Sequence, residues 1–226
     1  MGVDFSAVPL FKGLAGAELD GVVSAAHRVA RDAGGHFFEQ GAPADDFYVL
    51  AEGRVKMTQI TPDGHQVVLR LVAPGSPFGG VAAFGHPVYP VGAEAIEPSL
   101  ALGWDGRTMA RLLEGNARLA MNALQFVATQ LRDVQDRYRE LVTEKVERRV
   151  ARALLRLARD TGRKIDTGVL IDLPLTREDL AEMTGTTIYT VSRLIASWEE
   201  KGLVEGGRQR IVIRKPHGLV VIADDL

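Results

Sequence analysis

The segment Thr176–Arg214 decides the fold and reads TREDLAEMTGTTIYTVSRLIASWEEKGLVEGGRQRIVIR. It holds two short helical patterns on either side of Gly185, where a tight turn can require a positive φ. The apolar positions are Leu180 and Ala181 in the first pattern and Val191, Leu194 and Ile195 in the second. Because Ala181 is small, the two helices can approach closely. Two helices joined at a steep angle by a short glycine-containing turn predict a helix-turn-helix.

The second helix of the pair has the side chains needed to read DNA. Thr186 or Thr187 can cap its N-terminus, and Arg193 can donate two hydrogen bonds to O6 and N7 of a guanine. The candidate base-facing residues are Thr187, Ile188, Tyr189, Thr190, Ser192 and Arg193, and the candidate phosphate contacts at the first helix are Thr176 and Arg177. A helical hairpin that binds no nucleic acid has the same spacing and is the alternative.

A basic β-hairpin is expected to follow. Lys201-Gly202 ends the second helix, and two short apolar runs, 203–205 and 211–213, read as strands joined at Gly206-Gly207. The cations on and beside this hairpin are Arg208, Arg210, Arg214 and Lys215. Since such side chains can contact phosphates, the hairpin is predicted to be the wing of a winged helix.

The pattern L-T-x-x-x-L-A-x-x-x-G-T-T-x-x-T-V-S-R-L, followed by W-E-x-x-G-L-V, resembles the winged helix of the CRP/FNR family of bacterial transcription regulators. The resemblance implies three partners, which are double-stranded DNA, a second copy of the chain and RNA polymerase. Ser192 and Arg193 match the oxygen-sensing branch of the family. Tyr189 departs from it, because that branch has glutamate at this position.

Composition limits the class of protein. The chain has 226 residues, of which 46% are hydrophobic, so two domains can each bury a core. No apolar run is long enough to span a membrane, and no secretory signal is evident, so a cytoplasmic protein is expected. The absence of cysteine excludes a disulfide framework and a cysteine-held iron–sulfur cluster. The net charge of −2 gives no global sign of nucleic-acid binding.

Residues 34–82 alternate apolar and polar positions, with turn signals at Gly41, Gly53, Gly64 and Gly75. This pattern predicts an antiparallel roll or sandwich, and FYVLAEGRVKM resembles the second half of a cyclic-nucleotide-binding β-roll. The predicted fold class is α+β. It comprises an N-terminal double-stranded β-helix (a jelly-roll-like β-roll), a long dimerisation helix and a C-terminal winged helix-turn-helix.

A helical seam is expected after the roll. Apolar residues recur in steps of three and four across four heptads, which is typical of a coiled coil. The predicted dimer seam consists of Leu113, Leu124, Val127, Leu131, Val134, Tyr138 and Leu141. The alternative is a helix packed on its own roll. The resulting domains are an effector-sensing roll at 1–105, a dimerisation helix at 106–143 and a DNA-binding domain at 144–226, with a hinge near Thr143.

The family resemblance indicates which residues a cyclic-AMP-binding member would need. Family members that bind it have a glutamate after F-G for the ribose and an Arg-Ser/Thr pair for the phosphate. Here Gly80 stands at the glutamate position and Tyr89-Pro90 at the Arg-Ser/Thr position. A buried phosphate without such partners would cost several kcal/mol. The sequence therefore disfavours cyclic AMP and predicts a pocket for a flat, apolar effector, lined by Phe78, Gly79, Gly80, Val81, Tyr89, Pro90, Leu124, Val127 and Leu131.

Haem is the leading candidate for that effector, because haem-dependent members of the family sense nitric oxide or carbon monoxide. The candidate iron ligands are His27, His36, His65 and His86. His86 is the best placed, because it follows the altered phosphate cassette. The alternative for each is a surface or turn histidine.

Two other functions compete with this reading of the sequence. A metalloenzyme of the cupin kind would need a cluster such as His-x-His, and the sequence has none, nor any nucleophile or nucleotide-loop motif. A cyclic-nucleotide-binding module for protein partners would leave the winged helix unexplained. A non-enzymatic, DNA-binding regulator is therefore the prediction.

Overall fold

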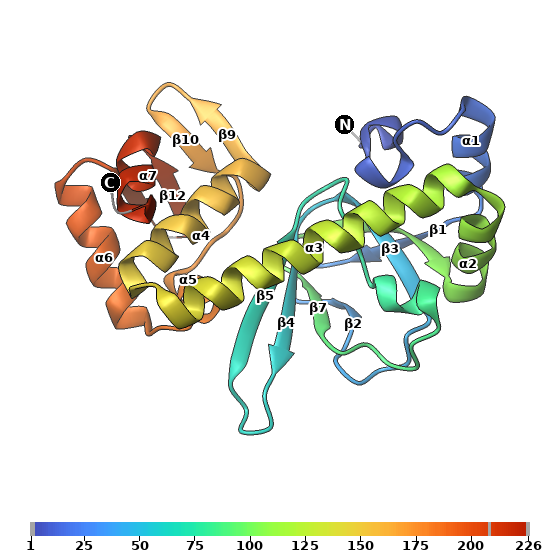
Figure 1. The fold of residues 1–226 in the computed structure, drawn as a ribbon, viewed down its shortest axis with the longest axis horizontal. Helices are drawn as coiled ribbons and strands as arrows, with labels where there is room; N and C mark the ends of the chain where they lie inside the picture. Colours follow the sequence, from blue (N-terminus) through green and yellow to red (C-terminus); the bar gives the residue numbers. More distant parts are fainter. Residues whose placement is uncertain (1–2, 208, 225–226) are drawn as a thin grey trace. The chain divides into compact units, whose positions relative to one another are not determined.

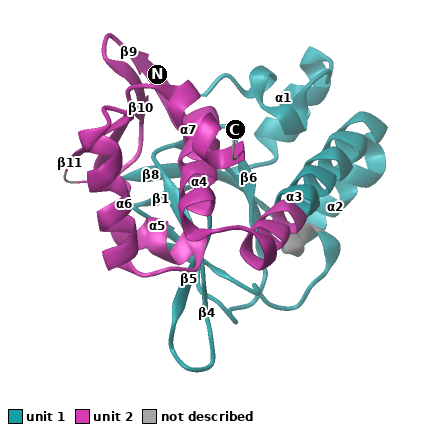
Figure 2. Ribbon diagram, turned by 60° about the vertical axis from the view of Figure 1, so that its left-hand side comes forward, with its two compact units in different colours: residues 1–133 teal, residues 134–226 magenta. Residues whose placement is uncertain are grey.

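The computed structural model describes residues 3–207 and 209–224, apart from the side chains of residues 81 and 83. It contains two compact units, residues 1–133 and residues 134–226 (Figure 2). Two predicted site residues are affected: Arg208 lies outside the described residues, and nothing is described of the side chain of Val81.

The first unit is a roll of two four-stranded antiparallel sheets. The first sheet has the order β1 (His27–Arg31), β8 (Ser99–Asp105), β3 (Asp46–Glu52) and β6 (Pro77–Phe78). The second has the order β2 (His36–Phe38), β7 (Gly92–Ala95), β4 (Val55–Ile60) and β5 (Gln66–Val72). Figure 1 labels strands β1 to β5 and β7 of this roll. This arrangement confirms the β-roll expected from the alternating pattern.

Helical elements precede, interrupt and follow the roll. They are η1 (Phe5–Ala7), η2 (Pro9–Phe11), α1 (Gly16–Ser24), η3 (Gly80–Phe84), α2 (Gly106–Gly115) and α3 (Ala117–Thr143). Trp104 of β8 is fully buried beneath the helices of this unit, and its Nε1 donates a hydrogen bond to the Val22 carbonyl at 2.8 Å. One apolar core thus joins the first sheet to these helices.

A second core, between the sheets, is rich in aromatic rings. Phe38 and Tyr89 stack with their ring centroids 3.8 Å apart, and Tyr48 and Phe78 stack at 5.0 Å. Phe37 meets Phe78 edge to face. These buried rings fill the interior of the roll.

The predicted seam is not one continuous helix. α2 ends at Gly115, and Asn116 has extended backbone angles, with φ −136° and ψ 100°. The Asn116 Oδ1 accepts a hydrogen bond from the Leu119 N–H at 2.9 Å, so Asn116 acts as a cap for α3. Leu113 therefore lies on α2, packs against the first core and is separated by this break from the α3 residues of the predicted dimer seam.

The second unit contains the end of α3 and a winged helix. Its further elements are α4 (Val146–Thr161), β9 (Gly162–Ile165), β10 (Gly168–Ile171), α5 (Arg177–Thr184), α6 (Ile188–Glu200), β11 (Val204–Gly207), β12 (Arg210–Ile213) and α7 (Pro216–Asp224). The strands form one antiparallel sheet of order β11-β12-β10-β9. The predicted helix-turn-helix is confirmed as α5 and α6.

The turn of the wing lies at a different place from the one predicted. Gly206 and Gly207 pair with Ile211 and Arg210 in the ladder, so both glycines lie in β11 and do not form the turn. The turn follows them, and Gln209 there has φ 55°. Two glycines indicated a turn because they adopt positive φ readily, but here a non-glycine residue does so.

Candidate nucleic-acid interface and effector cavity

The first helix of the pair begins with a reciprocal cap. The Asp179 N–H donates to Thr176 Oγ1 at 3.0 Å, while the Thr176 N–H and hydroxyl donate to Asp179 Oδ2 at 3.0 and 2.6 Å. Such a capping box satisfies backbone groups that a helix start leaves unpaired. Both donors of Thr176 are thus used within α5, whereas the expected phosphate contact would need one of them.

The turn between the helices places the start of α6. Gly185 ends α5 with φ 60° and ψ 48°, as the sequence predicted. Thr187 is the cap of α6, because its Oγ1 accepts from the Thr190 N–H at 3.2 Å and lies 3.1 Å from the Thr190 hydroxyl. The first turn of α6 therefore starts from a fixed geometry.

The inner face of α6 is anchored to the rest of the unit. Val191, Ile195 and Trp198 are fully buried. The Trp198 Nε1 donates to Glu147 of α4 at 3.2 Å, and Glu199 Oε1 accepts from the Gly206 N–H of the wing at 2.7 Å. α6 is thus held from both α4 and β11.

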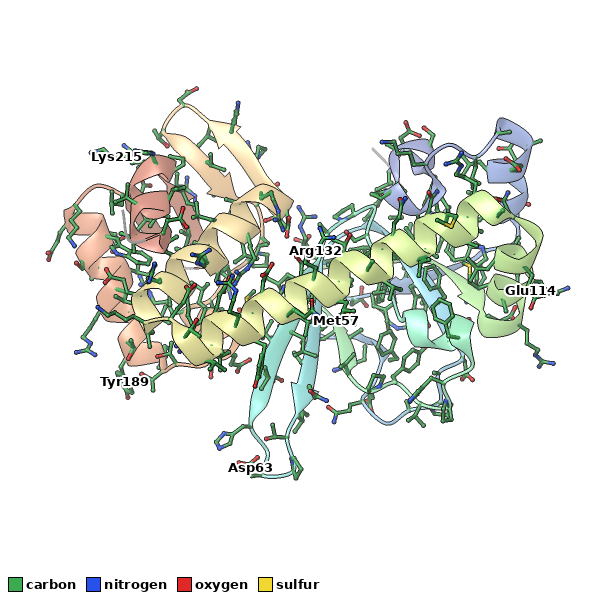
Figure 3. All side chains as sticks on the ribbon, in the orientation of Figure 1. Met57, Asp63, Glu114, Arg132, Tyr189 and Lys215 are labelled. Carbon is green, nitrogen blue, oxygen red and sulfur yellow. The ribbon has the colours of Figure 1, made fainter. Side chains whose placement is uncertain are left out.

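The opposite face of α6 is open. Ile188, Tyr189 and Arg193 are exposed, while Thr190 and Ser192 are partly exposed. Figure 3 shows the Tyr189 side chain pointing away from the ribbon. The residues chosen from sequence as base-facing therefore share an accessible surface.

The wing cations are partly neutralised by one carboxylate. Arg214 lies 2.7 Å and Arg210 3.6 Å from the oxygens of Glu205. All three side chains are substantially exposed. Phosphates of DNA can compete for the two guanidinium groups, because surface ion pairs of this kind contribute little.

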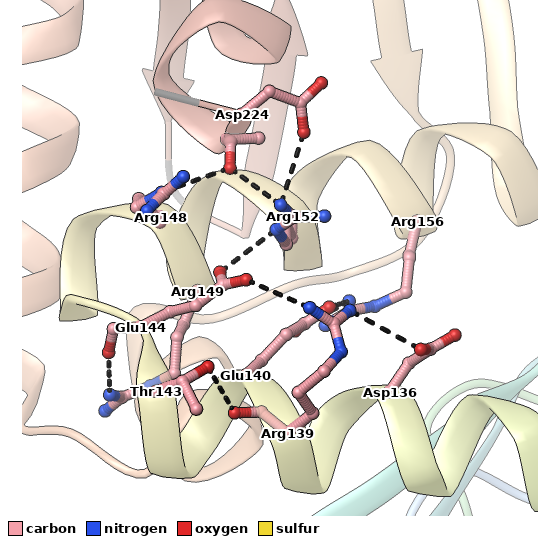
Figure 4. A network of polar contacts seen from close by, with 11 residues as sticks. Asp136, Arg139, Glu140, Thr143, Glu144, Arg148, Arg149, Arg152, Arg156 and Asp224 are labelled. Carbon is pink, nitrogen blue, oxygen red and sulfur yellow. Dashed lines mark hydrogen bonds and ion pairs between the residues drawn. The ribbon is translucent and has the colours of Figure 1, made fainter. Parts of the chain in front are cut away.

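A polar network, which the sequence did not predict, joins the last turns of α3 to α4 (Figure 4), and Arg149 of α4 extends it to the helix-turn-helix. The Arg149 guanidinium donates to the backbone carbonyls of Glu144, Thr184 and Gly185 at 2.9, 3.0 and 3.2 Å. Arg156 Nη1 donates to both carboxylate oxygens of the buried Glu140, at 2.7 and 2.9 Å. The only sequence signal was the number of arginines in the segment that forms α4.

An apolar cavity of about 860 Å³ lies in the first unit. Its lining comprises Leu10, Phe47, Gly80, Phe84, Gly85, His86, Pro87, Met109, Leu113, Ala120, Ala123, Leu124, Phe126 and Val127. Gly80, Leu124 and Val127 were predicted pocket residues. His86 is the one side chain in this lining with a nitrogen that can bind a metal ion.

The other predicted pocket residues lie elsewhere. Phe78 and Tyr89 are buried in the aromatic core, Pro90 is exposed, and Leu131 lies beyond the lining of the cavity. Gly79 has φ 68°, and a Cβ there would come within 3.1 Å of the Phe38 and Tyr48 rings. The aromatic residues that suggested a pocket wall instead fill the space between the sheets.

Tyr89 also has a structural hydrogen-bonding role. Its hydroxyl donates to the Asp46 carbonyl at 2.6 Å and accepts from the Asp46 N–H at 2.9 Å. Burial raises the pKa of Tyr89 to about 12, so the hydroxyl stays protonated.

The candidate histidines have different surroundings. His65 pairs with Asp63 on the exposed β4–β5 turn, and His27 lies 3.6 Å from Asp46. The ring of His86 is held through Nδ1, which is 2.6 Å from the Val88 carbonyl. The same Nδ1 lies 3.4 Å from the Val88 N–H, so the tautomer decides whether it donates or accepts. Within the described part of the chain, Nε2 of His86 has no hydrogen-bond partner, and in the tautomer that donates through Nδ1 it presents a free lone pair.

Arg70 connects β5 to the helix wall of the cavity. Its Nη2 donates to the Pro77 carbonyl at 3.0 Å and its Nη1 to Gln130 Oε1 at 3.2 Å. The guanidinium also lies over the Phe126 ring, 5.4 Å from the centroid. Phe126 thus lines the cavity and also contacts Arg70, whose guanidinium links the roll to α3.

Comparison with known proteins identifies both units. A Crp-like helix-turn-helix domain model matches residues 148–222, and a cyclic nucleotide-binding domain model matches residues 29–116. The transcriptional regulator LdrP of Thermus thermophilus is 33% identical over 174 residues, 77% of this chain and 85% of that protein. The cyclic AMP receptor protein of the same organism is 29% identical over 215 residues, 95% of this chain and 96% of that one.

Solved structures agree. FixK2 from Bradyrhizobium japonicum shares the fold, with a TM-score of 0.77, 23% identity and coverage of 87% of this chain and 96% of that chain. A CRP-family transcriptional regulator from Thermus thermophilus gives a TM-score of 0.73 at 26% identity, with the same coverage. With matching models in both units, a relative of 33% identity and these neighbours, the chain belongs to the CRP/FNR family of DNA-binding transcription regulators.

Proposed function

We propose that the chain acts in the cytoplasm as a homodimer that presents two copies of α6 to successive major grooves of a palindromic site. The observation that carries the proposal is an apolar stripe on α3. Leu124, Val127, Leu131, Val134, Tyr138 and Leu141 are all exposed in the single chain. Regularly spaced apolar residues left exposed on a helix mark a surface for another helix.

The roles on DNA follow from accessibility. Arg193 reads a base edge, since it stands on the open face of α6 and its guanidinium can form two hydrogen bonds to guanine. Arg177 and Arg210, with Arg208, contact phosphates and position α6. RNA polymerase is a further partner, suggested only by the family.

The effector is proposed to be a flat, apolar molecule in the cavity, with haem as the candidate. The walls are apolar, the volume is sufficient for a macrocycle, and His86 Nε2 is an available nitrogen donor. Haem would supply an iron centre that binds a gaseous ligand. His86 would hold the iron, and Phe126 and Leu124 would orient the ring.

Cyclic AMP is not favoured, although relatives include proteins named cyclic AMP receptor protein and cAMP-activated regulator. The lining described for the cavity contains no arginine or lysine to bind a phosphate. The aromatic core also fills the interior of the roll.

The test titrates the purified protein with haem, followed by the Soret band, and with cyclic AMP and cyclic GMP by calorimetry. We expect haem uptake and no cyclic-nucleotide binding at micromolar concentration. His86→Ala should shift or abolish the Soret band, while His65→Ala, at the exposed turn, should leave it unchanged. Micromolar binding of a cyclic nucleotide without haem uptake would refute the proposed effector.

A further inference from the structure

The outermost stripe of α6 combines an aromatic ring with a guanidinium group. Val191, Ile195 and Trp198 define the buried face, and the positions half a turn away are Tyr189, Arg193, Ala196 and Glu200. All four are exposed. Tyr189 and Arg193 are four residues apart, so both side chains face whatever α6 contacts.

The first turn of α6 exposes an apolar surface. Tyr189 is 79% and Ile188 44% exposed. Within the described residues, the Tyr189 side chain has no hydrogen bond, ion pair or ring contact. Single exposed apolar residues are ordinary, but two adjacent ones at the reading end of a DNA-binding helix indicate an apolar contact in the complex.

The major groove offers one apolar group on its base edges, the 5-methyl group of thymine. We propose that Tyr189, flanked by Ile188, is a specificity-determining residue that recognises a thymine methyl group beside the guanine read by Arg193. This inference rests on the proposed role of α6 in base reading.

The spacing limits where the thymine lies. Four residues of α-helix span about 6 Å, and stacked base pairs are about 3.4 Å apart. Tyr189 is therefore about two base pairs from the contact of Arg193. Tyrosine carries no charge, so in contrast to a carboxylate it does not favour the cytosine amino group at that position.

The experiment first selects a binding site from random duplex DNA with the full chain. Each thymine of the half-site is then replaced in turn by deoxyuridine, which removes only the methyl group. One position should weaken binding about fourfold, as expected for one buried methyl group. Tyr189→Ala should bind the thymine and deoxyuridine duplexes equally, whereas Tyr189→Phe should keep the wild-type discrimination. Tyr189→Glu should shift the preferred base at this position toward cytosine.

Two results would overturn the inference. One is a wild-type protein that selects a site but is insensitive to deoxyuridine at every thymine. The other is a loss with Tyr189→Phe as large as with Tyr189→Ala on all sequences, which would make the hydroxyl a phosphate contact. Failure of the wild type to select any site would refute base reading by α6 itself, and this inference with it.

Discussion

Arg193 is exposed on the outer stripe of α6, and no carboxylate is paired with it in the described part of the chain. Arg193→Ala should weaken binding to the selected site by about 1–3 kcal/mol, because two hydrogen bonds to a guanine are lost. Binding to random duplex DNA should change much less. Fluorescence anisotropy with both duplexes measures the difference, and Arg193→Lys serves as a control that keeps the charge but not the planar donor pair. Equal weakening on both duplexes would make Arg193 a phosphate contact.

A substitution at Tyr89 tests whether this residue of the aromatic core stabilises the roll or binds the effector. Tyr89→Phe removes one hydroxyl and leaves both backbone groups of Asp46 without that partner, which should lower the free energy of unfolding of the roll by about 1–3 kcal/mol. Urea unfolding provides the measurement. Tyr189→Phe, the same chemical change at an exposed position, should have no effect on stability.

The outcome also decides between two positions for the effector. If Tyr89→Phe left stability unchanged but abolished effector binding, Tyr89 would line the effector site, as expected from the sequence. The sequence alone could not decide whether Tyr89 fills the core or lines the effector site. The family resemblance places Phe78 and Tyr89 at the ligand cassette, but it does not show whether neighbouring rings, here Phe38 and Tyr48, fill the space.

Among the elements, the junction of α3 and α4 carries the strongest polar contact. Glu140 is buried and accepts both hydrogen bonds from Arg156, so Glu140→Ala should destabilise the second unit by about 2–3 kcal/mol. Hydrogen exchange of residues 134–161 measures the loss. Asp136→Asn, which breaks the exposed ion pair to Arg139, should cost at most about 0.5 kcal/mol.

This junction includes the hinge predicted near Thr143. Bending there would break the two hydrogen bonds of Arg156 to Glu140, because these residues lie on opposite sides of Thr143. Arg149 in turn holds α4 to the carbonyls of Thr184 and Gly185. Rigid attachment of the α3 end to the helix-turn-helix is therefore expected. A Glu140→Ala protein with unchanged stability but stronger DNA binding in the absence of effector would instead show that the junction is a switch.

Elements marked by periodicity or by turn residues were predictable, whereas a break inside an apolar pattern and a helix without a polar face were not. Gly185, the cap at Thr187 and the buried face of α6 follow from spacing and turn chemistry, and the structure has all three. The break at Asn116 was missed, because a heptad count registers apolar positions and ignores a capping side chain within them. α7 was missed as well, since its short apolar run lacks a polar face.

For the whole molecule, the cavity and the apolar stripe proposed for assembly meet on one helix. Phe126, Leu124 and Val127 of α3 line the cavity, while Leu124 and Val127 also begin the exposed stripe. An occupant of the cavity therefore contacts the surface proposed to bind the second copy. Such an occupant can favour the DNA-competent dimer only if it binds that dimer more tightly than the incompetent one. A difference of about 1–3 kcal/mol between the two binding free energies is ordinary for allosteric proteins.

Assembly can be tested at Leu131, which is 57% exposed in the single chain. Leu131→Asp should leave the protomer folded, because the new carboxylate can remain in water, but a dimer would bury two like charges against each other. We expect monomers in sedimentation and weak DNA binding, since two half-sites about 34–36 Å apart must be occupied together. Gln125→Asp, an exposed position off the stripe, should remain dimeric and bind DNA normally. A Leu131→Asp protein that stayed dimeric would show that the copies associate through another surface, because no helix seam tolerates facing carboxylates at its centre.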